Sequence, residues 1–171
     1  MRHALSGGPG KRNGALTREE GRDLKRAEAE LGFCGLYVIG PRSGWPITFG
    51  VAKQASDAWH AIKRGHWDLH QIHAFAWTPG KPAAERVKRA MAERLADKRQ
   101  FENPEWYDVT AAEAIDCMEK IARSARVELF DEVERQRRLE RQTRAGTERK
   151  IAAFEHPRRQ LPPPIPRLVK G

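Results

Sequence analysis

Aromatic and cationic side chains gather near the middle of the chain. Lys63, Arg64 and Trp67 lie close together there, and rings interleaved with cations can stack bases and hold backbone phosphates. Two neighbouring tryptophans, Trp59 and Trp77, fit better as large core residues. Trp67 follows a turn, and its position is compatible with core packing and with base stacking. We therefore expect Lys63, Arg64 and Trp67 to contact nucleic acid.

Four histidines in the same stretch raise the question of a bound metal: His60, His66, His70 and His73. The last two are three residues apart on an expected strand, and an odd spacing places side chains on opposite faces of a sheet. This arrangement argues against a shared ion. The sequence therefore predicts no metal site, and polar edge residues are the simpler interpretation.

Five arginines occur close together near the C-terminus. Residues 123–171 hold thirteen Lys and Arg against seven Asp and Glu, which is most of the formal net charge of +9. Such a surplus favours polyanions as partners. The arginines wrap around an expected helix, a pattern typical of nonspecific phosphate contact; the alternative use of this helix is a coiled-coil homodimer through residues 126–154. The five arginines expected to contact phosphates are Arg135, Arg137, Arg138, Arg141 and Arg144.

The hydrophobic pattern predicts a small α/β (α+β) domain over residues 33–124. GLYVIG and ITFGVA, joined by PRSGWP, are typical of two antiparallel strands, and DLHQIHAFAW is typical of a third. Helices are expected to begin near residues 56, 82 and 110 and to flank a three-stranded, mainly antiparallel sheet. The apolar positions expected in the core are Leu36, Val38, Ile47, Ile62, Val87, Met91 and Ile115.

Four further segments flank this domain. Thr17 and Glu20 form a capping-box pattern at the start of a helix, and Gly32 is placed to end it. We expect Gly146 to break or fray a second, strongly charged helix. The segments are a flexible arm (1–16), an N-terminal helix (17–32), a long charged C-terminal helix (125–154) and a Pro-rich basic tail (155–171).

The order of these pieces resembles a known domain. LYVIG, ITFGVA, AERVKRAMAERL and EWYDVTAAEAI resemble the successive motifs of the GIY-YIG nuclease domain, in its divergent bacterial and phage branch, over residues 33–122. The resemblance implies a small α/β fold that cuts phosphodiester bonds with one divalent metal such as Mg²⁺. The metal activates a bound water, and a cation stabilises the phosphate oxyanions.

The functional positions that the resemblance implies are only partly kept. The tyrosine of the first motif maps onto Tyr37, but the tyrosine of the second maps onto Phe49, which has no hydroxyl. The phosphate-binding arginine maps onto Ala58. The metal-binding glutamate maps onto Lys88, whose positive charge repels a divalent cation. A shift of one helical turn would bring Glu85 to this position instead.

These replacements predict a nucleic-acid-binding protein whose metal-dependent cleavage is lost or impaired. DNA or RNA is the expected partner, Lys88 is among the expected contacts, and no cofactor is expected. We expect Lys88 and Tyr37 to point into a common cleft. Two alternatives stay open: an active endonuclease that uses Tyr37 and Glu85 with Mg²⁺, and a non-enzymatic interaction protein that dimerises through residues 126–154.

Cysteine content and hydropathy bear on the cellular location of the protein. Cys34 and Cys117 are the only cysteines, too few for a disulfide framework or a cysteine zinc site. No apolar run approaches the ~20 residues that a membrane span needs, and the N-terminus has no apolar secretory region. We expect a cytoplasmic protein with no membrane partner.

Overall fold

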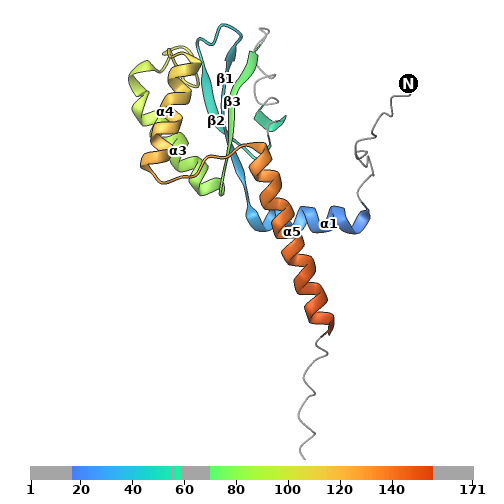
Figure 1. The fold of residues 1–171 in the computed structure, drawn as a ribbon. Helices are drawn as coiled ribbons and strands as arrows, with labels where there is room; N and C mark the ends of the chain where they lie inside the picture. Colours follow the sequence, from blue (N-terminus) through green and yellow to red (C-terminus); the bar gives the residue numbers. More distant parts are fainter. Residues whose placement is uncertain (1–16, 55, 59–69, 156–171) are drawn as a thin grey trace, which may run out of the picture.

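The computed structural model describes residues 17–54, 56–58 and 70–155 (Figure 1). Its centre is an antiparallel sheet of three strands in the order β2-β1-β3. The expected sheet and the mixed α/β class are confirmed. The strands are β1 (Cys34–Pro41), β2 (Thr48–Ala52) and β3 (His70–Thr78).

Two helices cover one face of this sheet, as Figure 1 shows. They are α3 (Lys81–Arg94) and α4 (Ala111–Ser124), and a short 3₁₀ turn, η1 (Ala96–Lys98), follows α3. Side chains alternate along a strand, so Leu36 and Val38 of β1 point toward the helices. The predicted core is confirmed at five positions, Ile115 is half-buried, and Ile62 lies outside the described residues. The five buried positions are Leu36, Val38, Ile47, Val87 and Met91.

The opposite face of the sheet carries a second, smaller cluster. Ile39 packs there with Ala52 and Ala58, and Tyr37 packs against them. The rings of Tyr37 and Phe75 lie flat over two glycines. A Cβ built on Gly50 would be 2.3 Å from the Tyr37 hydroxyl oxygen, and one on Gly35 would be 2.1 Å from the Phe75 ring. The glycines are therefore required for the rings to cover the sheet.

The helices α1 (Arg18–Leu31) and α5 (Glu132–Glu155) pack against each other beyond the end of the sheet (Figure 1). The expected capping box of α1 forms, because Thr17 accepts from the Glu20 amide at 3.2 Å. Gly32 ends α1 with a φ of 58°, in the left-handed region that glycine adopts readily. Our expectation that Gly146 breaks α5 is wrong, because the helix continues through it without interruption.

The start of the C-terminal helix also differs from our prediction. Residues 126–131 are not helical, and α5 begins at Glu132. Val127 is buried in the main core, and the backbone of Phe130 pairs with that of Trp77 through two hydrogen bonds of 2.8 and 3.0 Å. Asp131 then caps α5 by accepting from the Glu134 amide at 2.8 Å. Burial of these two apolar side chains therefore outweighs helix propensity here.

Several predictions fall on parts of the chain that the structure does not describe. They concern the arm 1–16, residues 156–171 of the tail, and Lys63, Arg64 and Trp67. Among the described helices, none combines the length and the apolar character that a bilayer crossing requires.

Candidate functional site

Tyr37 lies half-buried on the face of the sheet that carries the smaller cluster of Ile39, Ala52 and Ala58. Its cross-strand partners are Gly50 on β2 and Phe75 on β3, and its ring covers Gly50. Burial raises the pKa of the Tyr37 phenol, and the negative charge of Glu105 raises it further. The phenol therefore stays protonated at neutral pH and offers a hydroxyl, not a phenolate.

Phe49 lies on the other face and belongs to the main core. Its ring stacks on that of Tyr107 with a centroid distance of 4.6 Å and an interplanar angle of 28°. Alternation along β2 places the preceding residue, Thr48, on the same face as Tyr37, opposite Ile39. Thr48 is thus the hydroxyl-bearing residue of β2 on the face of Tyr37, and the sequence analysis did not single it out.

Ala58 is a packing position. It is 1% exposed and contacts the cluster of Ile39 and Ala52. An arginine at this point would have to place its guanidinium in that apolar cluster, at a high desolvation cost. The structure therefore places Ala58 in the core and not at the mouth of a phosphate site.

Lys88 and Glu85 lie side by side on α3. The Lys88 Nζ is 3.5 Å from the Glu85 Oε2, and both side chains are partly exposed. The buried stripe of Ala84, Val87 and Met91 fixes the rotation of α3, so a shift by one turn does not occur. Because α3 covers the face opposite Tyr37, the common cleft that we expected for Lys88 and Tyr37 is not formed.

The residues present do not fit the metal site that the GIY-YIG resemblance implies. Glu85 is paired with an ammonium, and the Tyr37 hydroxyl lies across the sheet from it. The two described histidines are engaged locally: the His73 Nε2 lies 2.9 Å from the Pro41 carbonyl oxygen, and the His70 ring lies against that of Trp106. Within the described ranges, no three His, Cys, Asp or Glu side chains gather in a metal-binding arrangement.

Arg135 fastens α5 to the rest of the molecule. Its Nη2 donates to Glu28 of α1 at 2.8 Å and its Nη1 donates to Glu132 at 2.7 Å. The guanidinium lies 4.5 Å above the Trp77 ring, whose Nε1 donates to the same Glu132 at 2.7 Å. Only 16% of the side chain is exposed. The structure therefore gives Arg135 an intramolecular role instead of the expected phosphate contact.

Arg138 has a similar role. It donates to both carboxylate oxygens of Glu128 and, through Nε at 3.0 Å, to Glu134, and it lies 4.2 Å above the Phe130 ring. These hydrogen bonds lower the pKa of Glu128 and of Glu134 and raise the pKa of Arg138. Arg138 therefore holds the extended segment before α5 against the helix.

The other three arginines face outward. Arg137 and Arg141 are 68% and 70% exposed and form ion pairs with Glu134, at 3.7 and 2.9 Å, and the Arg141 Nε also donates to the Arg137 carbonyl oxygen at 3.4 Å. Arg144 is exposed and has no ion pair among the described residues. Spacings of four and three place these residues on one face of a helix, so the exposed arginines form a stripe. We call Arg137, Arg141 and Arg144 the outer stripe.

The net charge is distributed unevenly between the described body and the rest of the chain. The described residues hold 23 of the 32 Lys and Arg residues and 22 of the 23 Asp and Glu residues. They are therefore almost neutral as a group. Nearly all of the positive surplus belongs to the residues outside them, which hold nine cations and one carboxylate.

Three apolar residues of the segment 126–154, through which we expected a dimer to form, are buried within the chain. Val127, Phe130 and Leu139 are buried. Val133 and Ile151 are exposed, but they lie 18 residues apart near opposite ends of α5. The described part of residues 126–154 therefore presents no continuous apolar stripe to a second copy.

No family model, no curated protein and no solved structure matches this chain. The features left to interpret are the order of the motifs, the sheet and the placement of the charged side chains. Among these charged side chains, the outer stripe is a group of exposed arginines on one face of α5.

Proposed function

We propose that the chain is a nucleic-acid-binding protein, built on a GIY-YIG-like sheet that lacks an assembled cleavage site. The observation that carries the proposal is the outer stripe of Arg137, Arg141 and Arg144 on the exposed face of α5. The stripe spans about 10 Å along the helix, which is the rise of about three nucleotides in a DNA strand. Three guanidiniums at this spacing suit contacts to successive phosphates.

The charge outside the described residues supports the same partner. Nine cations against one carboxylate add affinity that is independent of base sequence, because each phosphate contact releases condensed counterions. Lys63, Arg64 and Trp67 are among these residues and remain predicted contacts. Lys88 is also a predicted contact and, like Arg137 and Arg141, it lies beside a carboxylate.

The active-endonuclease alternative has less support. Hydrolysis would require Tyr37 and Glu85 to act on one phosphate, with the carboxylate holding the metal. The two residues lie on opposite sides of the sheet, and Glu85 is paired with Lys88. The geometry therefore favours binding over cleavage.

Binding is tested by fluorescence anisotropy with DNA and RNA oligonucleotides over a series of salt concentrations. We expect the triple variant Arg137→Gln, Arg141→Gln, Arg144→Gln to bind more weakly, and the slope of log K against log salt to fall by about 2–3. The matched control changes three exposed cations of α3, η1 and α4: Arg86→Gln, Lys98→Gln and Lys120→Gln. Equal losses in the two variants, or no loss in the first, would contradict the proposal.

Cleavage is tested by plasmid nicking with Mg²⁺ or Mn²⁺. The expected result is no nicking above the protein-free reaction, and no difference between the unmodified chain and Glu85→Ala. Metal-dependent nicking that disappears in Glu85→Ala would support the endonuclease alternative instead.

A further inference from the structure

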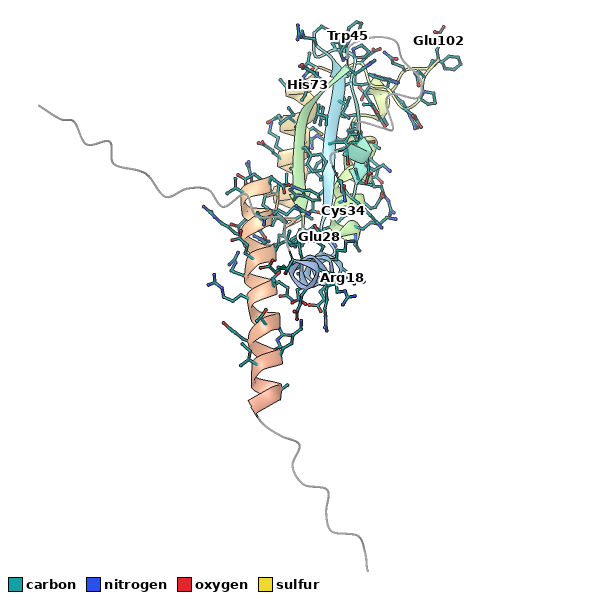
Figure 2. All side chains as sticks on the ribbon, turned by 90° about the vertical axis from the view of Figure 1, so that its right-hand side faces the viewer. Arg18, Glu28, Cys34, Trp45, His73 and Glu102 are labelled. Carbon is teal, nitrogen blue, oxygen red and sulfur yellow. The ribbon has the colours of Figure 1, made fainter. Side chains whose placement is uncertain are left out.

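A pocket of about 400 Å³ lies where α1 ends and where β1, α3 and α5 begin. Four cations line it, and each comes from a different part of the chain: Lys25 from α1, Lys53 from the end of β2, Lys81 from the first turn of α3 and Arg135 from α5. Figure 2 shows the junction, with Glu28 and Cys34 labelled beside α1. We call this the junction pocket.

The junction pocket has an excess of positive charge. Glu28 is the one carboxylate among its lining residues, and it already accepts a hydrogen bond from Arg135 at 2.8 Å. The three lysines have no ion pair with any carboxylate in the described ranges. Because Glu28 and Glu132 both accept from Arg135, the excess positive charge of the pocket is that of its three lysines.

The helix ends at the pocket do not cancel this charge. The C-terminal cap of α1, Gly32, lines the pocket, and the N-terminal cap of α3, Gly80, lies beside it: a Cβ on Gly80 would be 3.6 Å from the Gly32 carbonyl oxygen. A helix C-terminus acts as about −0.5 charge and an N-terminus as about +0.5. The two contributions are opposite and similar, so the side chains determine the sign.

The charges of two of these lysines act on the thiol of Cys34, which also lines the pocket. Burial raises its pKa most, and the charge of Glu85 raises it further, whereas the charges of Lys81 and Lys53 both lower it. Two lysines from separate elements thus act on one sulfur atom at the start of β1. Both lysines line the junction pocket, so their positive charges border the same cavity.

The size and lining of the pocket restrict the ligand. Its volume lies within the range of about 300–1,000 Å³ that is typical of small-molecule sites. The Trp77 ring is buried beneath Arg135, so the pocket offers cations and not an exposed stacking platform. The lysine ammonium groups are suitable donors for phosphate oxygens, whereas Arg135 is already held by Glu28 and Glu132.

We propose that the junction pocket binds a terminal phosphate or diphosphate group, supplied either by a free nucleotide or by the end of a nucleic-acid strand. The proposal of a strand end as the source rests on the proposed function, whereas the proposal of a free nucleotide does not. The pocket is lined from α5 by Arg135, whereas the outer stripe lies on the exposed face of that helix. The two sites are therefore separable by substitution.

Calorimetric titration of the full chain with inorganic pyrophosphate tests the pocket. The variant Lys53→Ala, Lys81→Ala removes two exposed lysines, and Lys98→Ala, Lys120→Ala is the control with the same charge change. We expect the first variant to raise the Kd for pyrophosphate about tenfold or more and the control to leave it nearly unchanged. Equal weakening in both variants, or no binding by the unmodified chain up to about 10 mM, would overturn the proposal.

A second set of titrations distinguishes the sources. ADP is compared with adenosine, and one oligonucleotide is compared with and without a 5′-phosphate. A gain from the 5′-phosphate that is absent in Lys53→Ala, Lys81→Ala assigns the pocket to strand ends, whereas selective binding of ADP assigns it to a free nucleotide. The outer-stripe variant is expected to retain pyrophosphate binding. If the proposed function is wrong, this variant keeps its affinity for nucleic acid; if the pocket proposal is wrong, Lys53→Ala, Lys81→Ala keeps its affinity for pyrophosphate.

Discussion

Two regions of this molecule are held together by different interactions. The sheet with α3 and α4 encloses a continuous apolar cluster that includes Leu36, Val87 and Met91. The α1–α5 pair has few fully buried side chains, Ala27 and Leu139 among the described residues. Polar contacts join the two helices instead, such as Gln142 to Glu30 at 2.7 Å and Lys150 to Asp23 at 2.6 Å.

The difference shows why arginine content alone is a poor guide to nucleic-acid contact. The same helix carries Arg135 and Arg138, which bind carboxylates and cover rings within the chain, and the exposed outer stripe. Neighbouring residues on α5 thus have opposite roles. Which role an arginine takes depends on the helix face and on the elements packed against it.

The largest expected effect comes from the apolar region. Leu36→Ala should lower the free energy of unfolding by about 2–5 kcal/mol, because it leaves a cavity in a closely packed core. Ile151→Ala on α5 removes a similar side chain that is 52% exposed, and should change stability by less than about 0.5 kcal/mol. Urea unfolding followed by circular dichroism measures both. Equal costs would show that the two regions do not differ in this way.

Acid should weaken the ion-paired region. The pKa values of Glu128 and Glu134 are lowered mainly by hydrogen bonds from Arg138. A carboxylate whose pKa is lower in the folded state than in the unfolded state stabilises the fold at pH values above its unfolded-state pKa. This contribution is lost as the pH falls through the folded-state pKa. Below about pH 4.5, we expect amide resonances of α5 to shift before those of β1.

The variant Arg138→Gln provides the control for this titration, because it removes the guanidinium that contributes most to lowering both pKa values. The acid response of α5 should then move to higher pH. Simultaneous changes in α5 and β1, or an unchanged response in Arg138→Gln, would contradict the assignment. The capping carboxylate Glu113 also has a lowered pKa, so the first turn of α4 should respond to acid as well.

The smallest expected effect distinguishes two glycines. A Cβ at Gly146 meets no atom within 4 Å, so Gly146→Ala should stabilise α5 by about 0.5–1 kcal/mol. Gly50→Ala should destabilise the sheet, because the new methyl group would displace the Tyr37 ring. Thermal unfolding of the two variants gives the signs. Stabilisation by Gly50→Ala, or destabilisation by Gly146→Ala, would contradict the packing described here.

Local signals in the sequence were sufficient for much of the fold. Capping boxes at Thr17 and Thr110, strand alternation and the stripe of Val87 and Met91 all depend on neighbouring residues, and the structure contains each of them. The extended segment before α5 was missed because it depends on a distant contact, the pairing of Phe130 with Trp77. The Asp131 cap was the local signal that could have indicated where the helix begins.

The candidate site was less predictable for a related reason. Residue types alone do not show which side chains share a face, so Tyr37, Phe49 and Glu85 were assigned to one site although the sheet separates them. The junction pocket depends on four elements that meet only in the folded chain. The positions of Lys25, Lys53 and Lys81 in the sequence do not indicate that these residues line one pocket.

The division of roles along α5 can be tested with one matched pair of variants, Arg138→Gln and Arg144→Gln, each measured for unfolding free energy and for affinity to an oligonucleotide without a terminal phosphate. We predict that Arg138→Gln costs about 1–2 kcal/mol of stability and leaves the affinity of the folded protein unchanged. Arg144→Gln should leave stability unchanged, weaken binding and reduce the salt slope by about 1. The reverse pattern, or the same pattern in both variants, would contradict the account.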